Sequence, residues 1–124
     1  RFVEAAKAGE PLRVFGDGQQ SRCFCHVSDT VEALLHLAKC DRAPGGVFNI
    51  GGTEEVSILN LAKRVIELTV STSKIELVPY AEAYDSGFED MQRRKPVVDK
   101  LEAFTGFRPA TQLDEIVRST AGLA

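Results

Sequence analysis

The fold is decided near the N-terminus by the stretch Val14-Phe15-Gly16-Asp17-Gly18-Gln19-Gln20-Ser21-Arg22-Cys23-Phe24-Cys25-His26-Val27-Ser28-Asp29. It predicts a strand over residues 11–15, a turn at the two glycines and a second strand over residues 20–26, with the chain reversing as in a hairpin. Alternation along the second strand places Arg22 on the same face as Phe24 and His26. A helix follows at once.

Working outward, apolar residues at helical spacing predict two strong helices. The first contains Val31, Leu34, Leu35 and Ala38, with Ser28 or Asp29 as its cap. Ser57 caps the second, whose apolar stripe is Ile58, Leu61, Ala62, Val65 and Ile66. Helices and strands alternate along the chain, which predicts an α/β fold built on a small sheet with packed helices.

Weaker signals mark the remaining elements. A helix over residues 2–8 ends at Gly9, and short strands are expected over residues 47–50 and 74–78. Residues 79–96 lack periodicity and are expected to form a long loop. A short helix over residues 100–104 ends at Gly106, and Thr111 is expected to cap a last helix.

Length and composition predict one compact unit over residues 1–124, without a linker. Hydrophobic residues make up 44% of the chain and charged residues 27%, as in ordinary globular proteins. The net charge of −3 gives no general attraction to nucleic acid or membranes. No apolar run approaches the ~20 residues that a membrane-spanning helix needs. The odd cysteine count of 3 favours a reducing, cytoplasmic setting.

Arginines are the candidate ligand contacts. Arg22 lies on a strand directly before a capped helix, where its planar guanidinium could bind a pair of phosphates, or could equally form a surface salt bridge. The basic run from Arg93 through Arg94 to Lys95 could bind the same phosphates from the long loop, or could be a solvated patch. Because no aromatic residues are interleaved with it, the run does not favour nucleic acid.

Three other groups of residues allow both a functional and a structural interpretation. Asn49 precedes two glycines, so its amide could reach a ligand or could cap their turn. Cys23 and Cys25 point to one face of the strand and His26 to the other, which argues against a zinc site. A pair of acidic residues for acid/base chemistry stays open within residues 82–90, although such a loop is usually solvated.

Taken together, these motifs resemble the extended short-chain dehydrogenase/reductases, in particular the NAD-dependent sugar-nucleotide epimerases, dehydratases and decarboxylases. The resemblance rests on segments that occur in the family's order: Gly16-Asp17-Gly18, Gln20-Ser21-Arg22-Cys23-Phe24, Val27-Ser28-Asp29, Phe48-Asn49-Ile50-Gly51, Arg94-Lys95-Pro96, Lys100 and Gly106-Phe107-Arg108-Pro109. Val97 and Phe107 depart from the Asp and Trp that relatives usually have, so the specific substrate stays open.

The resemblance implies the C-terminal, substrate-binding part of a Rossmann-like enzyme. Arg22 would contact the diphosphate of a UDP- or dTDP-sugar, and Arg94 or Arg93 would close on it. Asn49 would add a polar contact, and Val14 would lie near the base.

The cofactor-binding half of such an enzyme is absent from this sequence. It contains no Gly-rich strand-to-helix turn for NAD and no Tyr-x-x-x-Lys pair, so no catalytic residue is assigned and the chain alone is expected to be inactive. Residues 1–8 already read as helix without an initiator Met, which suggests a piece of a longer protein.

Two further expectations concern partners. Helices 29–40 and 57–68 would need cover for their apolar faces, which predicts a homodimer or an exchanged oligomer. The alternative function is a stand-alone ligand-binding or protein-interaction module derived from the same family.

Overall fold

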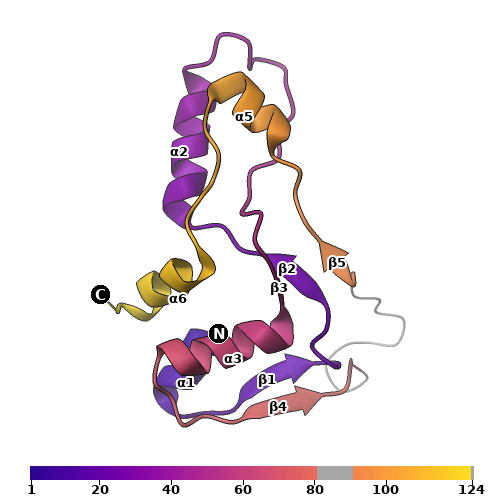
Figure 1. Cartoon of the computed structure of the whole chain (residues 1–124), viewed down its shortest axis with the longest axis vertical. Coiled ribbons are helices and arrows are strands. Elements are labelled where there is room, and N and C mark those ends of the chain that lie inside the picture. Colours follow the sequence, from indigo (N-terminus) through magenta and orange to yellow (C-terminus); the bar gives the residue numbers. More distant parts are fainter. Residues whose placement is uncertain (81–90, 124) are drawn as a thin grey trace. The chain divides into compact units, whose positions relative to one another are not determined.

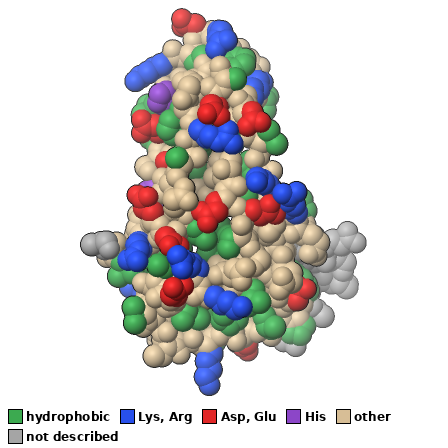
Figure 2. All heavy atoms as spheres, in the orientation of Figure 1, with side chains coloured by type: hydrophobic (Ala, Val, Ile, Leu, Met, Phe, Trp, Pro, Cys, Tyr) green, Lys and Arg blue, Asp and Glu red, His purple; other side chains and the backbone are tan. Residues whose placement is uncertain are grey.

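A computed structural model describes residues 1–80 and 91–123, and it shows an α/β protein with small sheets (Figure 1). The described elements are α1 (Phe2–Ala8), β1 (Leu12–Phe15), β2 (Ser21–Cys23), α2 (Val27–Ala38), β3 (Glu55–Ser57), α3 (Ile58–Leu68), β4 (Ile75–Val78), β5 (Arg93–Arg94), α5 (Asp99–Thr105) and α6 (Leu113–Ala121). None of the described helices is long and apolar enough to cross a bilayer. Over the face drawn in Figure 2, acidic and basic side chains are interspersed.

The chain divides into two compact units. The first comprises residues 1–22, 56–94 and 117–124, and the second comprises residues 23–55 and 95–116. Each crossing falls within or beside a strand or helix, so no run of Gly, Pro or Ser marks a boundary. The residues at these crossings therefore do not read as linkers in the sequence.

The first unit is built on a parallel pair of strands that helices α1 and α3 cover. Residues of β1 pair in register with β4, from Leu12 opposite Ile75 to Phe15 opposite Val78. Leu12 and Val14 are fully buried. Gly18 is needed at the following turn because a Cβ there would lie 2.7 Å from Val14 Cγ1.

The predicted hairpin between β1 and β2 is wrong. Gly16 and Gly18 do form the turn, with φ of 67° and 70°, but the two strands enter different sheets. β1 pairs with β4, and β2 lies between β3 and β5. Pairing with a segment far along the chain places β1 in the core of the first unit, where Leu12 and Val14 on one face are fully buried while Arg13 on the other stays exposed; an isolated two-stranded hairpin could not bury them in this way.

The second unit packs α2 against α5. Its buried hydrophobic residues are Ala33, Val98, Leu101 and Leu113. Residues 47–50 do not form the predicted strand. Side-chain bonds hold them instead: Lys100 Nζ donates to Val47 O at 2.9 Å, and Asn49 Nδ2 donates to Val97 O at 3.3 Å.

Helices α2 and α3 have opposite outcomes for their predicted apolar stripes. In α3 every stripe residue is buried or half-buried, as expected. In α2 the stripe of Val31, Leu34, Leu35 and Ala38 is exposed, and the buried position is Ala33. The prediction that this stripe faces the core of the described chain is therefore wrong.

The observed helix caps agree only in part with those predicted from the sequence. Ser57 Oγ accepts from Asn60 N at 3.2 Å, as predicted, but His26 rather than Ser28 or Asp29 caps α2. At the start of α6, the side-chain acceptor is Glu54 and not the predicted Thr111: Glu54 Oε2 accepts from Leu113 N at 3.0 Å.

Downstream of α5, Arg108 is held by two carboxylates. It bonds Glu102 at 2.6 Å and Asp99 at 3.3 Å. The hydrogen bonds to Glu102 and, second, to Asp99 raise the pKa of Arg108 above its usual value.

The Asp29 side chain joins the start of α2 to the segment before α6. Its Oδ2 accepts from Ala110 N at 3.2 Å and from Thr111 N at 3.0 Å. Asp29→Ala leaves both amides without this acceptor and is expected to lower the free energy of unfolding by about 1–2 kcal/mol. Asp29→Asn keeps one acceptor oxygen and should lose less than half of that. Urea denaturation monitored by circular dichroism measures both; equal losses would contradict the assignment.

Candidate nucleotide-diphosphate site

Arg22 and Arg94 are partners in one sheet of the first unit. Strands β2 and β5 run parallel, and Arg22 pairs in register with Arg94. Residues opposite each other in neighbouring strands project from the same face of the sheet. Arg22 and Arg94, from segments far apart in the sequence, are therefore neighbours in the sheet whose side chains leave the same face, which suits a ligand with two adjacent negative groups.

Arg93 projects from the opposite face. It pairs in register with Ser21, one position earlier in both strands, and side chains alternate along a strand. The sequence left Arg93 and Arg94 as alternatives. The register separates them, because only Arg94 shares the face of Arg22.

The two arginines differ in how they are held. Arg22 is half-buried, and its Nη1 donates to Ser21 O and to Met91 O, both at 2.7 Å. Arg94 is exposed, and within the described chain its side chain makes no hydrogen bond or ion pair. One cation is thus fixed and the other can reorient. The carbonyl of Met91 escaped sequence reasoning because any residue type offers a backbone acceptor.

Helix α3 adds little to anion binding, although it begins beside these strands. Its first amides are already used: Ile58 N donates to Gln20 O at 3.0 Å and Leu59 N to Gly18 O at 2.9 Å. Ser57 Oγ takes the next amide, as described above. Since these donors are occupied, the positive charge available to a ligand comes from the arginines.

Gln20 supports the turn that leads into β2. Its side chain is buried, and Nε2 donates to Phe15 O at 3.0 Å. Its other terminal atom, Oε1, is buried without a hydrogen-bond partner. The buried Gln20 amide therefore holds the turn between Phe15 and β2, and it offers no exposed atom to a ligand.

The other predicted contact residues are placed differently. Val14 is fully buried in the core of the first unit. Asn49 belongs to the second unit, where its amide nitrogen donates to Val97 O as described above. Their roles toward a ligand stay predictions.

Lys100 belongs to an aromatic cluster in the second unit. Its Nζ lies 4.6 Å from the centre of the Phe48 ring and 5.8 Å from that of Phe104. The Phe104 ring also contacts Arg42, whose Cζ lies 4.9 Å from the ring centre. Both cations are engaged with rings and backbone carbonyls: Lys100 ties Val47 to α5, and Arg42 bonds the carbonyls of Ala103 and Phe104 within α5.

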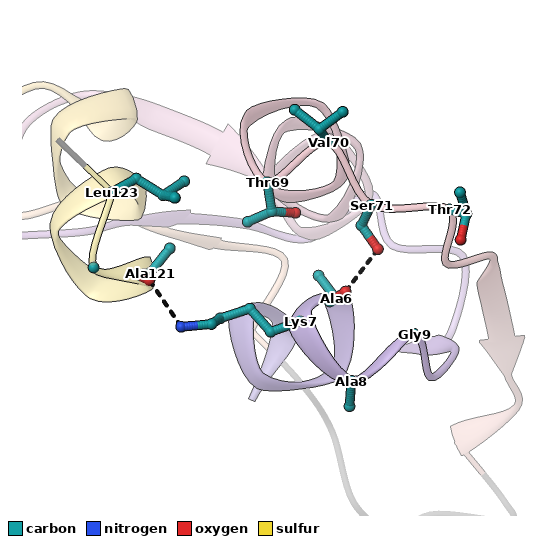
Figure 3. A pocket seen from close by; sticks show the side chains of 11 residues that line it. Ala6, Lys7, Ala8, Gly9, Thr69, Val70, Ser71, Thr72, Ala121 and Leu123 are labelled. Carbon is teal, nitrogen blue, oxygen red and sulfur yellow. Dashed lines mark hydrogen bonds between the residues drawn. The ribbon is translucent and has the colours of Figure 1, made fainter.

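A separate hollow of about 620 Å³ lies elsewhere in the first unit (Figure 3). Residues 6–9, 69–72 and 121–123 line it, and neither Arg22 nor Arg94 is among them. Its polar groups bond one another: Lys7 Nζ donates to Ala121 O at 3.0 Å, and Ser71 Oγ to Ala6 O at 2.7 Å.

Two other kinds of site were considered from the sequence. Among the described residues, no group of three or more His, Cys, Asp or Glu could hold a metal ion, and Cys23, Cys25 and Cys40 form no disulfide. The acidic residues Glu82, Asp85, Glu89 and Asp90, weighed as an acid/base pair, lie outside the described part of the chain.

The described glycines do not fit a dinucleotide-binding turn. Gly16 packs against the ring of Tyr80, and Gly18 lies between Val14 and Leu59. The turn that they form leads into strand β2, whereas a pyrophosphate-binding turn leads into a helix. We therefore derive no cofactor chemistry from these residues.

Comparison with known proteins shows what this chain is similar to. Residues 1–51 match the NAD dependent epimerase/dehydratase family. The chain is 42% identical over 120 residues to a UDP-N-acetyl-alpha-D-glucosaminuronate decarboxylase of Bacillus cytotoxicus, covering 97% of this chain and 37% of that protein. It is 39% identical over 112 residues to UDP-glucuronic acid decarboxylase 4 of Arabidopsis thaliana, covering 90% of this chain and 24% of that protein.

Solved structures agree with the sequence matches. A UDP-glucose 4-epimerase of Thermotoga maritima, solved with UDP-glucose, superposes with a TM-score of 0.84 at 28% identity, covering 98% of this chain and 37% of that one. The chain is thus similar to members of the NAD dependent epimerase/dehydratase family, and it spans between about a quarter and about a third of the length of the relatives named above.

Proposed function

We propose that this chain is the substrate-binding part of an NAD-dependent nucleotide-sugar enzyme, and that Arg22 and Arg94 bind the diphosphate of its substrate. The observation that carries the proposal is the parallel register that puts both guanidinium groups on one face of the sheet. Charge-assisted, bidentate hydrogen bonds make arginine well suited to phosphate. The names of the two decarboxylases favour a UDP-sugar over a dTDP-sugar.

In this proposal, substrate binding and catalysis belong to different parts of the family fold. The chain supplies substrate grip, while the rest of the family fold would bind NAD and supply the catalytic Tyr and Lys. We therefore propose that residues 1–124 alone bind nucleotide but do not turn over a UDP-sugar. Whether the whole enzyme epimerises, dehydrates or decarboxylates depends on the part of the fold outside this chain.

Calorimetric titration of the 124-residue chain with UDP, UMP and uridine tests the site. We expect micromolar binding of UDP, about tenfold weaker binding of UMP, and no measurable binding of uridine, because each phosphate adds a charge-assisted contact. UDP affinity should also fall as salt rises, since the arginines are solvent-accessible. Equal affinities for UDP and uridine would contradict a diphosphate clamp.

The second candidate function is a protein-interaction module, and the exposed apolar stripe of α2 is the observation that favours it. If none of the three nucleotides binds, this second function becomes the better account of the chain. The cytoplasmic setting and the homodimer predicted from the sequence stay predictions.

A further inference from the structure

We propose that Gln20 is a positioning residue for the diphosphate site: its buried side chain fixes the segment that leads to Arg22, and thereby orients the Arg22 guanidinium. The inference rests on the proposed function, because it concerns the site where that function places the diphosphate. Gln20 is too buried to contact a ligand itself, since only 4% of the residue is exposed. Any effect that it has on binding must therefore pass through a neighbour.

The Gln20 amide is satisfied on one side only. Its Nε2 donates to Phe15 O at 3.0 Å, whereas its Oε1 is buried without a hydrogen-bond partner. Among the described residues, Gln20 is the only polar one that is buried. A buried acceptor without a donor lowers the stability of a folded chain, and an apolar side chain of similar volume would avoid that loss. Stability alone therefore does not account for a glutamine at this position.

The backbone of Gln20 is anchored from a second direction. Its carbonyl oxygen accepts from Ile58 N at 3.0 Å, where α3 begins, while its side chain reaches back to Phe15 at the end of β1. Residue 20 is thus tied to two elements of the first unit just before β2 starts. An anchor at this point sets where the first residues of β2 lie.

Arg22 depends on the backbone that directly follows Gln20. Its Nη1 donates to Ser21 O and to Met91 O, both at 2.7 Å, and Ser21 N donates to Gln92 O at 2.8 Å. The carbonyl of Ser21 is therefore one of two acceptors that orient the guanidinium, and it belongs to the peptide that comes next after Gln20. Because a bidentate contact with phosphate requires one orientation of the guanidinium plane, a shift of this carbonyl weakens binding without removing the charge.

Arg94 does not share this support. It is exposed and lies on β5, which enters the sheet from the far part of the chain. Loss of the Gln20 amide should therefore weaken the phosphate contact of Arg22 and leave that of Arg94 unchanged. This difference separates a positioning role from a general loosening of the site.

A double-mutant cycle on the 124-residue chain tests the proposal, with UDP affinity measured by calorimetry. Gln20→Met keeps a similar volume but removes the amide, and we expect about fivefold weaker UDP binding because the guanidinium is no longer held in one orientation. In a chain that already carries Arg22→Lys, which has no planar fork to orient, Gln20→Met should cost less than about twofold. In a chain that carries Arg94→Ala, it should keep its cost of about fivefold.

Gln19→Met is the matched control, because Gln19 is the adjacent glutamine and is exposed. It should leave UDP affinity within about twofold of the parent. Gln20→Met removes an unpaired acceptor together with a donor, so its melting temperature should stay within about 2 °C of the parent. If Gln20→Met does not fold, Gln20→Leu removes the same amide with a shorter side chain, and the same pattern of affinities is expected.

Two results would overturn the positioning role alone. One is an unchanged UDP affinity in Gln20→Met, and the other is an equal loss in the parent and in the Arg22→Lys background, which would make Gln20 a purely structural residue. In both cases UDP still binds and Arg94→Ala still weakens it, so the diphosphate site stands. Failure of the proposed function looks different: the unsubstituted chain does not bind UDP, and the role of Gln20 falls with the site.

Discussion

Replacing Arg94 with alanine is expected to weaken UDP binding by about 30-fold, while the same substitution at Arg93 changes it less than about twofold. A charge-assisted contact to phosphate is worth roughly 2 kcal/mol, which corresponds to that loss of affinity. The two residues are adjacent, equally charged and both exposed, but the register places only Arg94 on the face of Arg22. The pair therefore separates a directed contact from the effect of net charge.

Calorimetry on the chain with each substitution measures the effect. Arg22→Lys serves as a further test, because it keeps the charge but loses the planar fork, and should weaken UDP about tenfold while leaving uridine unaffected. Arg64→Ala is a control on α3, where Arg64 pairs with Glu67 at 2.8 Å. Equal losses at positions 93 and 94 would show that general electrostatic attraction, and not a clamp, holds the nucleotide.

Local elements could be predicted from this sequence because their signals lie within a few residues. Ser57 caps α3, Gly9 ends α1 and Gly106 ends α5, the two glycines with φ of 72° and 71°. Each depends on a side chain or a left-handed residue acting on its immediate neighbours. Such interactions survive whatever the rest of the chain does.

Strand pairing could not be predicted in the same way. A strong turn at Gly16 and Gly18 predicts a hairpin, yet the strands before and after it pair with residues 75–78 and 93–94. Those choices depend on which faces can be buried across the whole fold. The same limit applies to the site: sequence indicated arginines at positions 22, 93 and 94, but only the register decides which of the last two faces Arg22.

Helix α2 shows a third limit. Its periodicity correctly predicts a helix with an apolar stripe, but periodicity does not say which protein surface covers the stripe. In the described part of the chain the stripe faces outward, and Ala33 is the α2 residue that enters the local core. An exposed stripe in a well-formed helix is thus informative about what the chain binds.

Gly52→Ala is expected to destabilise the second unit by about 3 kcal/mol, one of the largest effects of any single methyl group added to this chain. Gly52 is buried, and a Cβ on it would collide with the carbonyl oxygen of Phe24 and lie 2.9 Å from the carbonyl carbon. Both are backbone atoms, which no change of rotamer can move aside. The segment that follows β2 must therefore shift away from residues 51–52.

Thermal unfolding and hydrogen exchange measure the result together. We expect the melting temperature to fall by about 10 °C or more, with amide protection lost first in α2 and α5, because the collision lies in the second unit. Gly45→Ala is the control: its Cβ meets nothing within 4 Å, but its φ of 77° costs an alanine about 1 kcal/mol. If the two substitutions destabilise the chain equally, backbone conformation and not the close approach of Phe24 explains the glycine at position 52.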